Sequence, residues 1–110
     1  MKLGIGVGYS GAEMTLPMER ILLAEKLGYD SLWTAEAYGS DAISPLAYIA
    51  GFTKHIRLGT GVIQLAARTP AGCAMAVQTV DALAGGHRVI AGIGVDLIEL
   101  IWVARAPKRR

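Results

Sequence analysis

The sequence alternates four times between a short apolar run and a longer segment with the residue spacing of an amphipathic helix. The apolar runs are residues 2–7, 31–35, 55–63 and 88–95, and each carries few charges. The segments between these runs each have room for a helix of about 10 to 15 residues, which is enough chain for a helical crossover between parallel strands. The pattern therefore predicts an α/β protein whose four strands form one parallel sheet through right-handed βαβ units.

Turn and capping residues indicate where the intervening helices begin and end. Pro17 is a residue favoured in a first helical turn, and Gly28 ends the helix that follows it. The second helix is expected to begin at Ser44 and Pro45 and to run to about residue 53, and the third is expected to run from a Thr69 cap and Pro70 to the pair Gly85 and Gly86.

Composition excludes several classes of protein. Hydrophobic residues make up 53% of the chain, but no run reaches the roughly 18 apolar residues of a membrane span. Glycines interrupt residues 1–10, which argues against a signal peptide and favours a cytoplasmic protein. The single cysteine, Cys73, rules out an internal disulfide framework, and the basic residues 108–110 are too few to predict a nucleic-acid surface.

Three stretches of the sequence read "GYDSLWTAEAYGSDAISPLAYIA", "IRLGTGVIQLAARTPA" and "VDALAGGHRVIAGIGV". They resemble the luciferase-like monooxygenase superfamily, and its deazaflavin-dependent oxidoreductase branch in particular. Members of that family are (βα)8 barrels, so the resemblance implies that residues 1–95 are a (βα)4 half of such a barrel. Residues 96–110 do not resemble the family, and their apolar spacing predicts a helix that ends before a basic terminus.

The ends of the strands indicate where chemistry would be found. In parallel barrels the side chains at the carboxyl ends of the strands form the active-site face. Glu36 follows the second strand and Asp96 follows the fourth, so both are candidate catalytic residues. Glu36 could carry a proton or hold a ligand, or it could be a carboxylate held by loop amides. Asp41 is expected in a loop or at a helix N-cap. His55 and His87 precede their strands, on the opposite face.

The stretch "GTGV" at the end of the third strand would let a flat ligand approach the backbone closely. The resemblance implies a non-proline cis peptide at Gly61–Val62 beside a deazaflavin ring, with Glu36, Gly61, Val62 and Gln64 binding deazaflavin or FMN. It also implies that the cofactor carries out hydride transfer while the protein positions it and excludes water. The alternative is that the small residues only allow the barrel to pack.

A sheet of four strands has two unpaired edges, and eight strands close a parallel barrel. We therefore expect a homodimer in which each chain supplies half of the barrel. The sequence leaves three functions open. The first is a flavin- or deazaflavin-dependent oxidoreductase acting on a small molecule, and the second is a half-barrel that only self-associates. The third is a weak hydrolase whose divalent metal is held by Glu36 and Asp96 from two chains.

Overall fold

A computed structural model describes residues 1–8, 14–36 and 39–95 of the chain. Its strands are β1 (Gly4–Gly8), β2 (Ser31–Thr34), β3 (Arg57–Gln64) and β4 (Val89–Gly94). They pair in the order β1-β2-β3-β4, and every neighbouring pair is parallel. The predicted α/β class and the single parallel sheet are confirmed.

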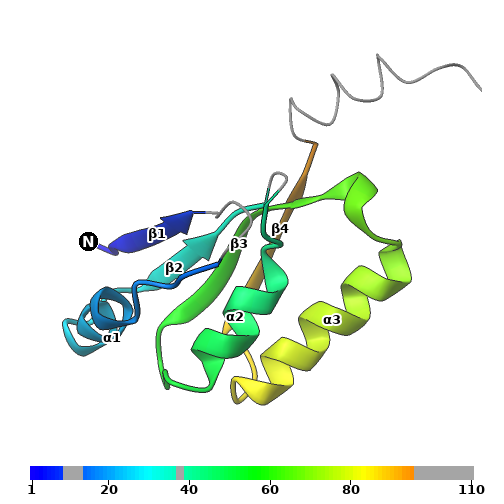
Figure 1. Ribbon diagram of the computed structural model, residues 1–110. Helices are drawn as coiled ribbons and strands as arrows, with labels where there is room; N and C mark the ends of the chain where they lie inside the picture. Colours follow the sequence, from blue (N-terminus) through cyan, green and yellow to red (C-terminus); the bar gives the residue numbers. More distant parts are fainter. Residues whose placement is uncertain (9–13, 37–38, 96–110) are drawn as a thin grey trace, which may run out of the picture.

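Three α-helices connect the strands and lie on one side of the sheet (Figure 1). They are α1 (Met18–Lys26), α2 (Ile43–Ala50) and α3 (Pro70–Leu83). A short 3-10 turn, η1 (Leu65–Ala67), joins β3 to the start of α3 and was not predicted. The tail predicted as a helix, residues 96–110, lies outside the described residues.

The capping residues confirm most of the predicted helix ends. Gly28, Gly85 and Gly86 all have positive φ, which a residue with a side chain adopts only at a cost. The Thr69 side chain accepts a hydrogen bond from the amide of Gly72 and caps α3, with Pro70 in the first turn.

The predicted start of α2 is wrong. The helix begins at Ile43, one residue before Ser44, and it ends at Ala50 rather than near residue 53. The Asp41 carboxylate accepts hydrogen bonds from the amides of Ile43 and Ser44. Asp41 lies in the loop just before the N-cap residue Ala42, so of the two expected places for Asp41 the loop is the one observed, and its carboxylate satisfies amides of the first helical turn.

The core lies between the helices and one face of the sheet. Large aliphatic side chains from the strands and from α1 and α2 fill it; the most completely buried are Ile21, Leu32, Leu46, Ile49, Ile56, Leu58 and Ile63. Leu32 and Leu58 are register partners, so their side chains leave the sheet on the same side. Successive residues of a strand point to opposite faces, so Trp33 and Gly59, also register partners, belong to the other face.

That second face is lined by small residues. A Cβ atom at Gly59 would lie 2.4 Å from the ring of Trp33, so the indole lies directly over the Gly59 backbone. The Trp33 indole N–H donates to the Ser31 hydroxyl at 2.9 Å, which fixes the ring along its own strand. A Cβ atom at Gly6 would meet no described atom within 4 Å. On the face of the sheet opposite the core, the described residues thus present glycine backbone and one indole ring.

The amino ends of β3 and β4 are held by acidic side chains from the helices. The Glu25 carboxylate of α1 accepts hydrogen bonds from the amides of residues 54–56, and Asp81 of α3 accepts from those of residues 87–89. His55 and His87 lie in these two segments, at the end of the sheet opposite the candidate site, as predicted. These hydrogen bonds fasten the amino ends of β3 and β4 to α1 and α3 and so stabilise the fold.

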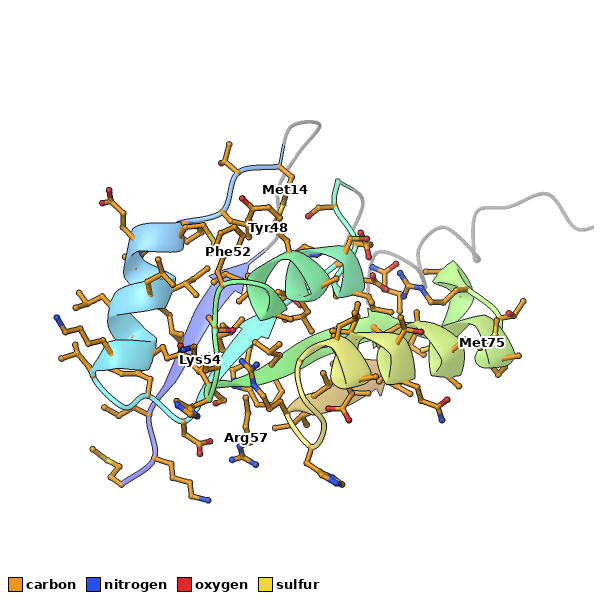
Figure 2. All side chains as sticks on the ribbon, turned by 90° about the horizontal axis from the view of Figure 1, so that it is seen from below. Met14, Tyr48, Phe52, Lys54, Arg57 and Met75 are labelled. Atoms are coloured by element: carbon orange, nitrogen blue, oxygen red, sulfur yellow. The ribbon has the colours of Figure 1, made fainter. Side chains whose placement is uncertain are left out.

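Apolar side chains also lie on the surface. The ring of Tyr48 on α2 and the ring of Phe52, just after that helix, lie in a tilted contact with centroids 5.0 Å apart. Met14 and Tyr48 line one pocket (Figure 2). Among the described residues, no helix is both long enough and apolar enough to cross a membrane.

Candidate functional site

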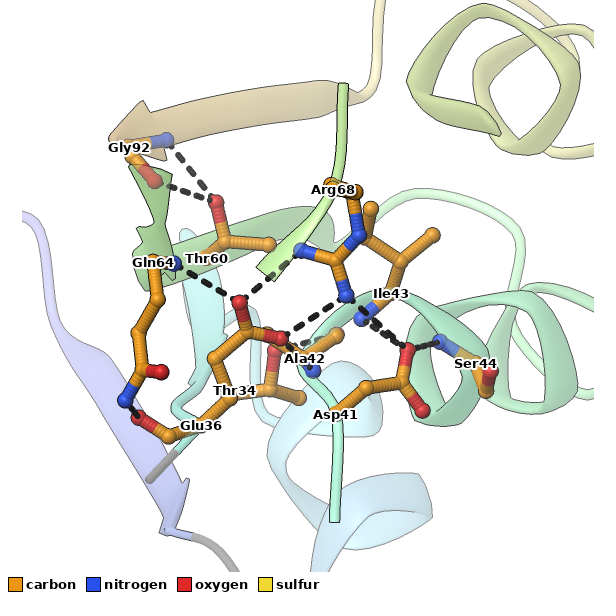
Figure 3. A network of polar contacts seen from close by, with 10 residues as sticks. All are labelled: Thr34, Glu36, Asp41, Ala42, Ile43, Ser44, Thr60, Gln64, Arg68 and Gly92. Atoms are coloured by element: carbon orange, nitrogen blue, oxygen red, sulfur yellow. Dashed lines mark hydrogen bonds and ion pairs between the residues drawn. The ribbon is translucent and has the colours of Figure 1, made fainter. Parts of the chain in front are cut away.

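Glu36 is the centre of a polar network at the carboxyl ends of β2 and β3 (Figure 3). The residue is only 6% exposed, although it is charged and follows an apolar strand. A buried carboxylate is stable only when its oxygens are hydrogen-bonded or paired with a cation. The contacts of Glu36 therefore decide what it can do.

Both carboxylate oxygens of Glu36 have two donors each. Oε1 accepts from the Gln64 amide at 2.7 Å and from Nη1 of Arg68 at 2.8 Å. Oε2 accepts from the Ala42 amide at 2.9 Å and from Nη2 of Arg68 at 3.0 Å. A carboxylate has about four acceptor positions, and all of them are used.

The network joins three segments that are distant in the sequence. Glu36 follows β2, Asp41 precedes α2, and Arg68 lies between η1 and α3. The Arg68 guanidinium contacts Glu36 in a two-pronged pair and approaches Asp41 to 3.9 Å. Gln64 adds a second link, because its side-chain amide donates to the Glu36 carbonyl at 3.0 Å. The loops after β2 and β3 are thereby fixed to one another.

These contacts keep Glu36 ionised. Burial would raise the pKa of Glu36, but the hydrogen bonds from Arg68, Gln64 and Ala42 outweigh it and hold the pKa below its ordinary value. The pKa of Asp41 is lowered in the same way, because the bonds from Ser44 and Ile43 outweigh the effect of burial. A carboxylate that stays ionised and has no free acceptor position is poorly suited to move protons. The geometry favours the alternative of a carboxylate held by loop amides.

The cofactor-facing candidates lie just before this network. The peptide Gly61–Val62 is cis, at the position that the resemblance implied. The β3·β4 register shifts between Thr60 and Ile63, so Gly61 and Val62 form a bulge in β3. Glu36, Gly61, Val62 and Gln64 therefore lie at one end of the sheet, as expected. Asp96, the other predicted catalytic residue, lies outside the described residues.

The Gly61 backbone and the Trp33 ring adjoin at the bulge. A Cβ atom at Gly61 would make only ordinary contacts, 3.7 Å from the Trp33 ring and 3.8 Å from the Thr34 carbonyl oxygen. Without that Cβ atom, the Gly61 backbone is open to close approach. Trp33 supplies an aromatic surface beside it. The described residues thus provide a surface against which a deazaflavin or flavin ring can lie.

The metal-hydrolase hypothesis finds little support at this site. It needs the Glu36 carboxylate as a ligand, and all acceptor positions of that carboxylate are already used. Within residues 1–8, 14–36 and 39–95, no group of three or more His, Cys, Asp or Glu side chains is arranged to hold a metal ion.

Sequence reasoning missed Arg68 as a site residue. Its position between strand and helix was visible, but its partner lies 32 residues earlier in the chain. Only the parallel pairing of β2 with β3 brings the two together. A cation close behind a strand end, with a lone carboxylate at the end of the preceding strand, is the signal that could have identified the pair.

The comparisons with known proteins agree with this architecture. Residues 2–103 match the family described as luciferase-like monooxygenase, so the match continues past residue 95, where the resemblance was expected to end. The protein "Putative coenzyme F420-dependent oxidoreductase Rv3520c" of Mycobacterium tuberculosis is 47% identical over 112 residues, which cover 98% of this chain and 32% of that protein. A 5,10-methylenetetrahydromethanopterin reductase of Methanolobus tindarius is 37% identical over 73 residues, covering 66% of this chain and 22% of the reductase.

Two solved structures have the same fold over nearly all of the chain. The coenzyme F420-dependent tetrahydromethanopterin reductase from Methanopyrus kandleri superposes with a TM-score of 0.73 at 25% identity, over 94% of this chain and 30% of that one. The monooxygenase RslO1 from Streptomyces bottropensis gives a TM-score of 0.75 at 26% identity, over 94% of this chain and 36% of that one. The chain thus spans about a third or less of the length of these relatives.

Proposed function

The chain belongs to the luciferase-like monooxygenase family, and from this membership we propose that it binds a deazaflavin against the carboxyl end of β3 as part of an oxidoreductase. The observation that carries the proposal is the 47% identity to a protein named as a coenzyme F420-dependent oxidoreductase. FMN is the second ligand of the same chemical kind to test. Bound in this place, such a cofactor would supply hydride transfer with a small organic substrate.

The residues of this chain would position the ring and exclude water from one side of it. The Gly61–Val62 bulge and the Trp33 indole form the surface for the ring. Gln64 and the Glu36–Arg68 pair hold the loops behind that surface in one arrangement. Rigid support of this kind favours catalysis because the reacting groups need little further ordering.

The test is a titration of the full chain with a deazaflavin and, separately, with FMN, followed by cofactor fluorescence. We expect saturable binding of the deazaflavin at micromolar concentrations. The absence of binding of either cofactor at tens of micromolar would contradict the proposal and would favour the alternative of a half-barrel without native catalysis. Gly61→Ala is the matched variant, because the added methyl group is tolerated by the fold but lies on the proposed binding surface.

We also propose that a second copy of the chain supplies the opposite wall. Two sheets of four strands give the eight strands of a closed parallel barrel. Within the described residues, β4 has no neighbour on its outer edge, and its Ile93 side chain is 54% exposed. Exposed strand edges with apolar side chains favour association.

Light scattering tests this assembly directly. We expect a mass twice that of one chain, and Ile93→Lys should shift the equilibrium toward the monomer. Leu83→Lys is the control, because Leu83 is an equally apolar, exposed residue on α3, away from the strand edge. A monomeric wild-type chain would contradict the proposal.

A further inference from the structure

The buried hydroxyl of Thr60 is bonded to the β4 backbone opposite the β3 bulge. Thr60 is 1% exposed and is the last residue of β3 before the register shifts. Its Oγ1 accepts a hydrogen bond from the Gly92 amide at 2.8 Å and donates one to the Gly92 carbonyl at 2.9 Å. Figure 3 shows this pair of bonds. One side chain thus holds both polar groups of a single residue on the neighbouring strand.

The pairing register of β3 with β4 explains why a side chain is needed to bond the Gly92 backbone. From Thr60 to Ile63 the chain takes three steps along β3, whereas the partners Ala91 and Ile93 are two steps apart on β4. The extra residue interrupts the regular ladder of backbone bonds opposite Gly92. Buried backbone groups that lose ladder partners must find others, and the hydroxyl of Thr60 is able both to donate and to accept.

The neighbouring glycines fit the same arrangement. A Cβ atom at Gly92 would lie 2.2 Å from the Thr60 carbonyl oxygen, so no residue with a side chain fits there. A Cβ atom at Gly94 would lie 3.2 Å from Cγ2 of Val62. The Val62 side chain therefore lies across the backbone of β4, over space that these two glycines leave free. The hydrogen bonds between Thr60 and Gly92 and the contact of the Val62 side chain with Gly94 together fix the position of the bulge against β4.

We propose that Thr60 is a positioning residue for the cofactor surface: its hydroxyl, bonded to both polar groups of Gly92, fixes where the Gly61–Val62 backbone stands. Thr60 does not itself touch the ligand in this arrangement. The inference rests on the proposed function, since it gives the bulge a role in holding a flat ring.

The test compares Thr60→Val with Thr53→Val. Valine has nearly the shape of threonine but lacks the hydroxyl. Thr53 is a matched control, because it is also buried and also makes one donated and one accepted bond, to the Ile49 carbonyl and from Arg88. It lies at the opposite end of the sheet from the bulge.

Both variants should lose stability, since each leaves buried polar groups without a partner. Only Thr60→Val should weaken deazaflavin binding by the folded protein, by about tenfold or more, because small displacements of a positioning surface have large effects. Thr60→Ser keeps the hydroxyl and should restore the affinity. Equal affinity of Thr60→Val and wild type would overturn the proposal.

A cofactor-independent measurement separates this inference from the proposed function. In amide NMR spectra of the full chain without ligand, Thr60→Val should shift the resonances of Gly61, Val62 and Gly92 well beyond the changes caused by Thr53→Val. If the wild type binds no cofactor, the proposed function fails, and these shifts still decide whether Thr60 positions the bulge.

Should Thr60→Val not fold, a slowly exchanging Thr60 hydroxyl proton close to the Gly92 amide in the wild type would support the inference. Its absence would contradict it.

Discussion

Arg68 and Glu36 form a two-pronged ion pair that joins the loop after β3 to the end of β2. The two N–O distances are 2.8 and 3.0 Å, and the side chains are 21% and 5% exposed. Paired guanidinium and carboxylate groups of this geometry are the strongest kind of side-chain hydrogen bond. Because the Glu36 carboxylate also accepts hydrogen bonds from the backbone amides of Ala42 and Gln64, one side chain connects both loops at the carboxyl end of the sheet.

Removing the cation should therefore be costly. Arg68→Gln leaves the buried Glu36 charge without its partner, and we expect a loss of about 2 to 3 kcal/mol in the free energy of unfolding, somewhat below the range for fully buried pairs because Arg68 is partly exposed. Arg68→Lys keeps the charge but not the planar fork, so its loss should be smaller. Urea denaturation measures both. Arg20→Gln, at an exposed position of α1, is the control, and a loss for Arg68→Gln no larger than for this control would contradict the role of the pair.

The stabilising effect of Glu36 should depend on pH with a defined sign. Its pKa is lower in the folded protein than its ordinary value of 4.5, so the ionised form favours folding. The contribution is complete above that ordinary value and is lost as the pH falls through the lower folded pKa. We expect Glu36→Gln to be much less stable than the wild type at pH 7 and the difference to shrink toward pH 3. Denaturation curves at both pH values measure it, and a constant difference would refute this account.

Replacement by alanine should destabilise the fold at one glycine of β3 and have little effect on stability at another. At Gly59 the new Cβ atom would lie 2.4 Å from the Trp33 ring, so Gly59→Ala should destabilise the fold by about 1 to 3 kcal/mol through overpacking. At Gly61 the nearest contact would be 3.7 Å, so Gly61→Ala should change stability by less than about 1 kcal/mol. Deazaflavin affinity should fall for Gly61→Ala in spite of its normal stability. If Gly61→Ala bound the deazaflavin as tightly as the wild type, the ring would not lie against this surface.

Much of the fold could be predicted from the sequence because its signals are local. Short apolar runs, glycines with positive φ and the Thr69 cap each act within a few residues, and they mark β1 to β4 and the ends of α1 and α3. The start of α2 was misplaced because both Asp41 and Ser44 are good capping residues. Only the structure shows that the Asp41 carboxylate takes the amides.

The site was less predictable because its contacts are distant in sequence. Glu36, Gly61, Val62 and Gln64 could be placed at one end of the sheet from strand order alone, and they lie there. The partners of Glu36 depend on how two loops cross, which no local pattern specifies, so Arg68 was missed. The hydroxyl of Thr60 was missed for the same reason, since its bonds to Gly92 exist only because β3 and β4 lose register.

Arg88 should matter for stability and not for binding. It is 8% exposed at the amino end of β4, and its guanidinium donates to the carbonyls of Ile56, Thr53 and Ala84 and to the Thr53 hydroxyl. Lysine cannot reach all of these acceptors with one ammonium group, so Arg88→Lys should lose about 2 to 3 kcal/mol in the free energy of unfolding. Arg57→Lys, in the more exposed pair with Asp30, should lose less than about 1 kcal/mol.

Because Arg88 lies at the end of the sheet opposite the bulge, the folded Arg88→Lys chain should bind deazaflavin as tightly as the wild type. A weaker deazaflavin affinity of Arg88→Lys would show that the two ends of the sheet are coupled. It would contradict the view that the amino ends of the strands serve stability while the carboxyl ends serve binding.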